Sequence, residues 1–406
     1  MSQDWKTTRV SDICKTNPNT YSVSEKWSYV NYLDTGSITE NSVSEIQHLV
    51  IGRDTLPSRA RRKVVVDDIL YSTVRPNQRH YGIVKDVVPN MLVSTGFAVI
   101  RVDKAKADAD YLYYYLTQNA IVDGLHAIGE QSVSAYPSIK PSDIESLEML
   151  LPSLPEQVEI GRSLKALDDK IANNTKINHH LEQMAKAIFK SWFVNFEPFG
   201  AVMPDDWQEG TIADTCSLIF NGGTPRRNEP TFWEGTIPWL TSGEVRQAII
   251  VKPDSCISEA GLKGSSAKWV PSLSTVVALY GATAGQVSMV ATPLTTNQAI
   301  TALVPKENCT YYNYLVMQNA VSQLENNAIG SAQQNISKAI VEKTACLIPT
   351  DTVLAEFDKL ISPFFNDWIQ NLFESSYLAA LRDTLLPRLM SGELSVADLG
   401  DAKCSK

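Results

Sequence analysis

Two copies of one pattern make up most of this chain, and the repeat constrains its fold more than any other feature. The segment that begins at Trp5 resembles the segment that begins at Trp207, with a Cys nine residues after each Trp. Farther along, Gln118-Asn119-Ala120 recurs as Gln318-Asn319-Ala320. An Ile-Gly pair and an apolar residue followed by Pro also recur in the same order. Four matches in one order predict two tandem copies of about 200 residues, which share a scaffold.

Each copy is expected to begin with a β-rich part and to end with a long helix. Apolar runs at residues 63–66 and 97–102, bounded by Gly, Pro and Asn, indicate strands. Between Glu156 and about Trp192, apolar residues recur in alternate steps of four and three. This 3.5-residue period is typical of a coiled-coil seam rather than of an amphipathic surface helix.

The same frame in the second copy predicts a second long helix, which Pro363 either starts or kinks. Each helix carries an Asn in its seam, Asn174 and Asn371, which lowers stability but fixes register and partner. A pair of ordinary core helices remains the alternative. The expected seam consists of Leu164, Leu167, Ile171, Asn174, Leu181, Ile188, Phe364, Trp368, Asn371, Leu378 and Leu385.

The composition is that of a folded, soluble protein. Of 406 residues, 44% are apolar and 20% charged, which excludes a disordered chain. Six cysteines without a C-x-x-C pair argue against zinc ribbons and redox dithiols and fit a reducing cytoplasm. The first residues contain no apolar segment of the kind found in signal peptides. Pro and Gly interrupt the uncharged stretch 269–305, so we expect it to form buried strands rather than a membrane-spanning helix.

Catalytic motifs are absent from the sequence. It contains no glycine-rich phosphate loop, no H-E-x-x-H and no N-P-P-[YF] adenine-methyltransferase run. Asp254, Glu259 and Lys263 lack the spacing of a metal nuclease. His179-His180 are expected to be solvated helix residues. Asp168 and Asp169 cannot share a substrate, because adjacent helical side chains diverge; they are expected to be surface charges that could pair with Arg or Lys of a partner. We predict a chain without catalytic residues, metal or cofactor of its own.

Local basicity is the positive evidence for nucleic-acid binding. The net charge of −9 argues against a general polyanion binder, so any such surface must be local. Residues 51–85 nevertheless hold eight Lys or Arg and three Asp. The candidates that can neutralise phosphates are Arg53, Arg59, Arg61, Arg62 and Lys63. The candidates that can form bidentate bonds to base edges are Arg75, Asn77, Gln78 and Arg79, for which a solvated loop is an equal alternative.

The second copy has its own cluster after Gly222-Gly223, where the glycines permit close backbone approach. Its candidate DNA contacts are Thr224, Arg226, Arg227 and Arg246. Trp239 is expected to belong to the core rather than to this site.

Several longer runs of the sequence stand out in one order along nearly the whole chain. They are Leu-Pro-Ser-Leu-Pro-Glu-Gln at 151–157, Ala166–Ile171, Met184–Phe196, Gly-Gly-Thr-Pro-Arg at 222–226 with Trp233 and Ile237–Trp239, and Leu385–Leu394. In this order the runs resemble those of the specificity (S) subunits of type I restriction–modification systems. One junction departs from the pattern, because Pro349 is followed by Thr-Asp-Thr-Val instead of Glu-Gln.

The resemblance implies an α+β architecture with an internal pseudo-two-fold repeat. Two β-rich target-recognition domains, at 1–152 and 200–350, would be separated by helical spacers at 153–199 and 351–406, packed as an antiparallel coiled coil. Because the two halves differ in sequence, we expect an asymmetric bipartite DNA site with an unspecified spacer, in contrast to the palindromic sites of symmetric dimers.

The resemblance also implies partners. The helices of an S subunit dock two adenine-methyltransferase subunits and, through them, restriction subunits, all in the bacterial or archaeal cytoplasm and without a membrane. S-adenosylmethionine, ATP and Mg would then belong to those partners. Two other functions remain open: an enzyme in its own right, and a coiled-coil scaffold that binds only protein.

Overall fold

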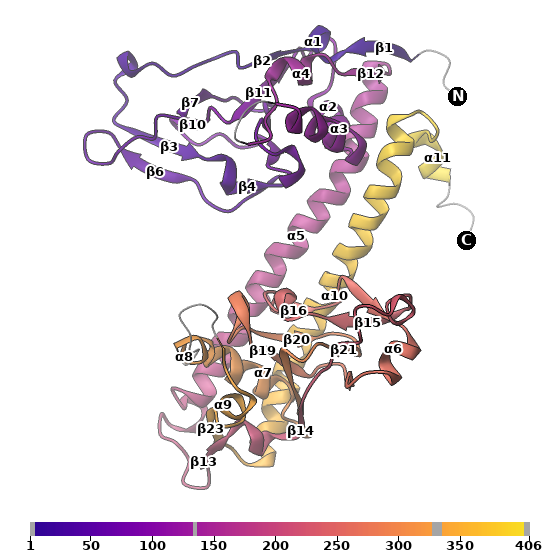
Figure 1. Cartoon of the computed structure of the whole chain (residues 1–406). Helices are drawn as coiled ribbons and strands as arrows, with labels where there is room; N and C mark the ends of the chain where they lie inside the picture. Colours follow the sequence, from indigo (N-terminus) through magenta and orange to yellow (C-terminus); the bar gives the residue numbers. More distant parts are fainter. Residues whose placement is uncertain (1–4, 133–135, 327–334, 402–406) are drawn as a thin grey trace. The chain divides into compact units, whose positions relative to one another are not determined.

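The computed structural model describes residues 5–132, 136–326 and 335–401, and it divides the chain into two compact units. Unit 1 comprises residues 1–171 and 377–406, and unit 2 comprises residues 172–376. Helices α5 (Leu154–Phe193) and α10 (Asp351–Met390) each contribute to both units (Figure 1). The long helix predicted from Glu156 to about Trp192 is therefore confirmed. Helix α10 continues through Pro363, which does not start it.

Unit 1 contains two four-stranded sheets, ordered β6-β3-β10-β7 and β2-β11-β8-β9, and the pairs β1-β12 and β4-β5 in the described residues. Its strands are β1 (Lys6–Arg9), β2 (Cys14–Thr16), β3 (Tyr29–Leu33), β4 (Ile38–Thr39), β5 (Ser42–Val43), β6 (Gln47–Val50), β7 (Ala60–Lys63), β8 (Ile69–Ser72), β9 (Tyr81–Ile83), β10 (Met91–Ser94), β11 (Phe97–Val102) and β12 (Glu148–Leu151). Its shorter helices are α1 (Val10–Ile13), α2 (Ala109–Thr117), α3 (Asn119–Glu130), α4 (Pro141–Glu145) and α11 (Val396–Asp401).

The strand predicted at 97–102 is confirmed as β11, whereas the strand predicted at 63–66 is wrong. Strand β7 ends at Lys63, and the side chains of Val65 and Val66 are 45% and 50% exposed. An unbroken run of β-branched residues favours a strand locally, but here the chain turns at once into Asp67, which has a positive φ of 74°.

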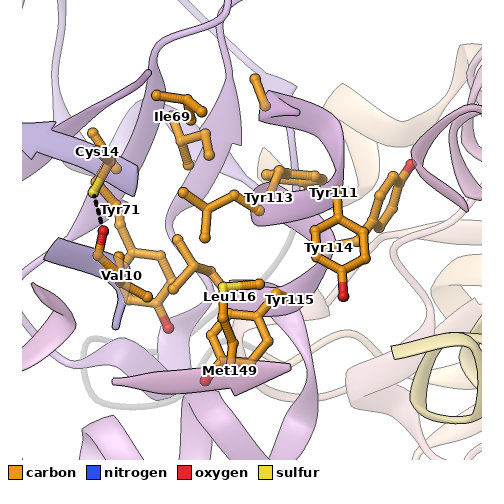
Figure 2. Close-up of a cluster of buried hydrophobic side chains, with 14 of the residues drawn as sticks. Val10, Cys14, Ile69, Tyr71, Tyr111, Tyr113, Tyr114, Tyr115, Leu116 and Met149 are labelled. Carbon is orange, nitrogen blue, oxygen red and sulfur yellow. Dashed lines mark hydrogen bonds between the residues drawn. The ribbon is translucent and has the colours of Figure 1, made fainter. Parts of the chain in front are cut away.

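Helix α2 forms the centre of the main core of unit 1 and packs its tyrosines against the strands around it (Figure 2). The Tyr111 and Tyr115 hydroxyls donate to the carbonyl oxygens of Leu150 and Glu148 in β12, both at 2.9 Å. Buried tyrosines need such acceptors, so these bonds tie α2 to one edge strand. The Cys14 thiol donates to Val10 O, and burial raises the pKa of Cys14 to about 12, so it stays a thiol at neutral pH.

Unit 2 contains a five-stranded sheet ordered β14-β22-β19-β20-β16, a four-stranded sheet ordered β17-β15-β21-β18 and the pair β13-β23 in the described residues. Its strands are β13 (Gln208–Thr211), β14 (Cys216–Asn221), β15 (Ile237–Leu240), β16 (Ile249–Ile250), β17 (Ser255–Ile257), β18 (Trp269–Val270), β19 (Thr275–Ala278), β20 (Val287–Val290), β21 (Leu294–Thr296), β22 (Ile300–Pro305) and β23 (Ala345–Ile348). Its shorter helices are α6 (Glu259–Lys263), α7 (Thr310–Asn319), α8 (Val321–Asn326) and α9 (Lys338–Glu342).

The uncharged stretch 269–305 folds into strands β18 to β22, as predicted. Most of the residues in these strands are buried. No helix among the described residues is both long and apolar enough to cross a membrane.

The two long helices pack on each other inside unit 2 through an apolar stripe and a polar layer. Phe357 of α10 lies 4.8 Å from the ring of Phe193 in α5. Asn174 is fully buried, and its Nδ2 donates to Glu374 Oε2 at 2.7 Å. Asn371 Nδ2 donates to Asn178 Oδ1 at 2.9 Å. Asn174 Nδ2 also donates to Asn371 O at 3.4 Å, so the two asparagines predicted for the seam lie together in one hydrogen-bonded layer.

The buried row of α10 coincides with the predicted one at Trp368 but lies one residue beside it at Phe365 and Leu386. Phe365 is fully buried whereas Phe364 is partly buried, and Leu386 is more buried than Leu385. A straight helix of 3.6 residues per turn drifts away from a strict 3.5-residue frame, which accounts for the shift by one residue. Of the other predicted seam residues, Leu164, Asn174 and Trp368 are buried, and Leu167, Ile171, Leu181, Ile188, Asn371 and Leu378 are partly buried.

Candidate nucleic-acid interface

The basic residues predicted to contact phosphates lie on β7 and on the segment that precedes it in unit 1. Lys63 pairs with Glu25, and its Nζ lies 5.2 Å from the ring centroid of Trp27. Arg53 pairs with Asp54 at 3.0 Å. Both cations therefore have an acidic neighbour that lowers their local positive potential.

The other three arginines of this group differ in exposure. Arg59 is exposed, and Arg61 Nε donates to Ser58 O at 3.4 Å. Arg62 Nε is buried without a hydrogen-bond partner in the described part of the chain, and burial lowers the pKa of Arg62. Of these three arginines, Arg59 is thus the best exposed for a phosphate.

The residues predicted to read base edges lie on one turn, between β8 and β9, that contains the short 3-10 helix η3 (Pro76–Gln78). Asn77 and Gln78 are exposed on it. Arg75 stacks over Tyr136, with 5.1 Å between its guanidinium carbon and the ring centroid. Arg79 is held from several sides, because its guanidinium donates to Glu40 Oε1 and to the Tyr81 hydroxyl, both at 3.2 Å, and to Asn119 Oδ1 at 2.6 Å.

In unit 2, the Gly222–Arg227 loop is fixed against its own unit. A Cβ on Gly222 would lie 2.1 Å from Thr296 O, so the close approach that the glycines permit is to the protein backbone. Trp239 is buried and its indole N–H donates to Gly223 O at 2.9 Å, which confirms it as a core residue.

Aromatic and amide side chains order the polar part of this loop. The Arg227 guanidinium lies 4.3 Å from the ring centroid of Trp233, and Trp233 Nε1 donates to Arg226 O at 3.1 Å. The Thr224 hydroxyl donates to Gln298, an exposed residue that sequence reasoning missed because no local motif marks it. Arg226 and Arg246 are exposed.

The sequence predicts Asp168 to be a surface charge that could pair with Arg or Lys of a partner, but the side chain is partly buried and its partners lie in its own unit. Arg382 Nη1 donates to Asp168 Oδ1 at 2.7 Å, and the Tyr114 hydroxyl donates to Oδ2 at 2.6 Å. Burial and the Asp168 charge raise the pKa of Tyr114, which keeps its hydroxyl a donor. These residues line a cavity of about 620 Å³ that also contacts Arg79 and Asn119.

Removing the guanidinium from this network is expected to destabilise unit 1. Arg382→Ala leaves a carboxylate that is only 28% exposed without its cation, and we expect the free energy of unfolding to fall by about 2 kcal/mol. The matched control is Lys165→Ala, which breaks the more exposed pair with Asp169 and should cost under about 1 kcal/mol. Urea unfolding of both variants measures the two free energies. Equal losses of stability would contradict a stabilising role of the Arg382–Asp168 pair.

The remaining titratable candidates do not assemble into a centre. His179 and His180 are exposed on α5, as predicted. Among the residues that the structure describes, no group of three or more His, Cys, Asp or Glu residues could hold a metal ion.

Comparison with known proteins decides the family. A family model described as type I restriction modification DNA specificity domain matches residues 2–183 and 204–373. The chain belongs to this family. The resemblance inferred from the sequence runs is thereby confirmed, and with it a role in DNA sequence specificity within a restriction–modification complex rather than in catalysis.

Curated members of the specificity family align along nearly the whole chain. The HindI specificity subunit of Haemophilus influenzae is 26% identical over 96% of this chain and 100% of its own length. The MjaIX specificity subunit of Methanocaldococcus jannaschii is 24% identical over 89% of this chain and 83% of its own. A crystal structure of a type I restriction-modification system S subunit from M. genitalium covers 95% of this chain and 96% of its own, with a TM-score of 0.61 at 13% identity, and shares the fold.

Proposed function

We propose that this chain is the DNA-specificity subunit of a type I restriction–modification system and reads an asymmetric bipartite site. Target-recognition domains at 1–152 and 200–350 would each read one half-site, and residues 153–199 and 351–406 would form the helical spacers. The observation that carries this proposal is that the family model matches the chain twice, once in each copy of the sequence repeat.

The order of strands supports an internal repeat. Both units contain a four-stranded sheet in which the two central strands are parallel, β3 with β10 and β15 with β21. In each unit a first strand pairs antiparallel with the strand before a long helix, β1 with β12 and β13 with β23. The two copies differ in the side chains at their polar turns, which supports different half-sites rather than a palindrome.

The proposed DNA contacts are the residues singled out above, together with Gln298. They are Arg53, Arg59, Arg61, Arg62, Lys63, Arg75, Asn77, Gln78 and Arg79 in unit 1, and Thr224, Arg226, Arg227, Arg246 and Gln298 in unit 2. The ordered Arg227–Trp233 stack and the exposure of Arg226 support the second set.

The long helices would pack as an antiparallel coiled coil and dock two adenine-methyltransferase subunits, which in turn hold restriction subunits. Within unit 2, late residues of α5 such as Phe193 contact early residues of α10 such as Phe357, which supports the antiparallel direction. S-adenosylmethionine, ATP and Mg would be bound by those partners, in the cytoplasm where the DNA lies.

A methylation map of a plasmid tests the proposal. In cells that co-express this chain with its methyltransferase subunit, single-molecule sequencing should find a split adenine-methylation motif that disappears when this chain is omitted. Co-purification of the two proteins without any new methylated motif would instead support the protein-binding scaffold.

The acidic net charge adds a prediction about affinity. We expect the isolated chain to bind its site weakly and the methyltransferase subunits to tighten binding, because they supply contacts to the DNA backbone. Gel-shift affinities that are equal with and without those subunits would contradict this part of the proposal.

A further inference from the structure

A similar turn occurs in both units. Residues 75–79 lie between the antiparallel strands β8 and β9 in unit 1, and residues 281–285 lie between the antiparallel strands β19 and β20 in unit 2. In the first turn Gln78 N donates to Arg75 O at 2.9 Å, and in the second Ala284 N donates to Gly281 O at 3.0 Å.

The same neighbouring segment holds each turn. Val74 forms an isolated antiparallel bridge with Ser138, and Tyr280 forms the corresponding bridge with Asn335. One residue before each bridge, a carbonyl accepts a backbone hydrogen bond: Ile139 N donates to Thr73 O at 2.8 Å, and Ile336 N donates to Leu279 O at 2.9 Å. Backbone bonds to the same neighbouring segment therefore hold the start of the turn in both units.

This shape requires the left-handed conformation at both ends of the turn. In unit 2 the two positions are Gly281 and Gly285, with φ of 81° and 88°. Glycine adopts this region readily, whereas any residue with a Cβ is disfavoured there. In unit 1 the same positions are Arg75 and Arg79, with φ of 47° and 56°. Two arginines thus stand where the backbone favours glycine, and strain of this kind persists chiefly where side chains serve a function.

The two arginine side chains are arranged differently. Arg79 is 34% exposed and donates to Glu40, Tyr81 and Asn119, so three of the five guanidinium N–H donors are used within unit 1. The Arg75 guanidinium instead stacks over Tyr136, beside exposed Asn77 and Gln78. In the unit 2 turn, the three residues between the two glycines are small. Ala282 is exposed, while Thr283 and Ala284 are buried.

We propose that Arg75 and Arg79 occupy these glycine positions because DNA recognition needs their side chains, and that the two have separate roles. Arg75, with Asn77 and Gln78, contacts the bases of one half-site. Arg79, which is placed above among the candidate contacts, contributes to recognition chiefly as a positioning residue that fixes the turn on α3. The counterpart turn of unit 2 makes no base contact, so unit 2 reads DNA through the Gly222–Arg227 loop and its neighbours. This inference rests on the proposed function.

Replacing Arg75 by Gly and by Ala separates the backbone from the side chain. Both variants lose the guanidinium, but only glycine relieves the left-handed conformation, so Arg75→Gly should have a higher Tm than Arg75→Ala. In the complex with methyltransferase subunits, both variants should lose sequence preference at one half-site by the same factor, about 10- to 100-fold. The sequence preference at the other half-site should be unchanged. If Arg75→Gly keeps wild-type recognition, the side chain is not the reader and the proposal fails.

Variants of Asn119, which accepts a hydrogen bond from Arg79, test the positioning role of Arg79. Asn119→Ala removes the acceptor of the 2.6 Å bond and should weaken recognition of the same half-site, whereas Asn119→Asp keeps an oxygen acceptor and should retain recognition. A merely structural role would lower Tm in the alanine variant without shifting preference between the two half-sites. Equal recognition by the two Asn119 variants would overturn the role.

Two controls complete the experiment. Lys26→Gly removes an exposed positive charge at another left-handed position of unit 1, where φ is 50°. It should change recognition by under about 2-fold, because one exposed charge makes at most one of the phosphate contacts that give DNA binding its salt dependence. Ala282→Asp places a negative charge on the unit 2 turn and should leave both half-sites unchanged; loss of one half-site would show that this turn also contacts DNA. If the wild-type chain directs no methylation motif, the proposed function fails; if it does and the Arg75 variants match it, only this inference fails.

Discussion

Replacing Phe357 by alanine is expected to lower the free energy of unfolding by about 4 kcal/mol. Phe357 is fully buried near the start of α10. Its ring lies 4.8 Å from Phe193 and 5.6 Å from Trp192, both on α5. Alanine would leave a cavity among large aromatic rings, and these closely packed rings cannot move far enough to fill it. The loss of stability therefore exceeds the transfer free energy of the removed atoms.

A second phenylalanine on the same helix provides the control for this prediction. Phe373 is 41% exposed, also in unit 2, and Phe373→Ala should cost under about 1 kcal/mol because little apolar area returns to water. Urea unfolding followed by tryptophan fluorescence measures both, since Trp192 lies beside the first substitution. Comparable losses for the two variants would mean that α10 is not packed as described.

Gly222→Ala is expected to lower the free energy of unfolding by about 3 kcal/mol and to abolish recognition by unit 2. The added Cβ would lie 2.1 Å from Thr296 O and 2.5 Å from Asn297 O, which are backbone atoms that cannot turn aside. The loop must then move away from the end of β21, and the bond from Gly223 N to Thr296 O, now 2.8 Å, is lost. The same movement displaces Arg226 and the Arg227–Trp233 stack.

Gly243→Ala is the matched control, because the nearest atom to its added Cβ is 4.0 Å away. It should leave unfolding and methylation as in the wild type, whereas Gly222→Ala should lose one half of the motif. Circular dichroism melts and a methylation map distinguish the two results. Full recognition by the Gly222 variant would remove this loop from the candidate interface.

The parts of the structure that follow from local periodicity were predictable. The long helices follow from the spacing of apolar residues, and β11 follows from an apolar run bounded by turn residues. Trp239 was placed in the core correctly. Such patterns report the local backbone period directly, so no knowledge of distant contacts is needed.

Long-range pairing was beyond the reach of these patterns. Asp168 pairs with Arg382, which is 214 residues away, and nothing near either residue marks the other. Arg75 and Arg79 were selected for their chemistry, but their left-handed backbone was not predictable, because residue preference argues against it. The glycines at 222 and 223 were correctly associated with close approach, yet the atoms that they approach belong to strands and turns far along the chain.

The composition of unit 1 has a consequence for the order in which the chain folds. Its main core contains residues from the first strands and helices together with Leu386, Leu389 and Met390 from the end of α10, and Gly392 lies against the ring of Trp5. Unit 2, in contrast, is one continuous segment. On the ribosome, where chains emerge from the N-terminus onward, unit 2 has all its residues before unit 1 does. A chain released early, after residue 376, therefore completes only its second core, and both cores are present together only in chains translated through α10.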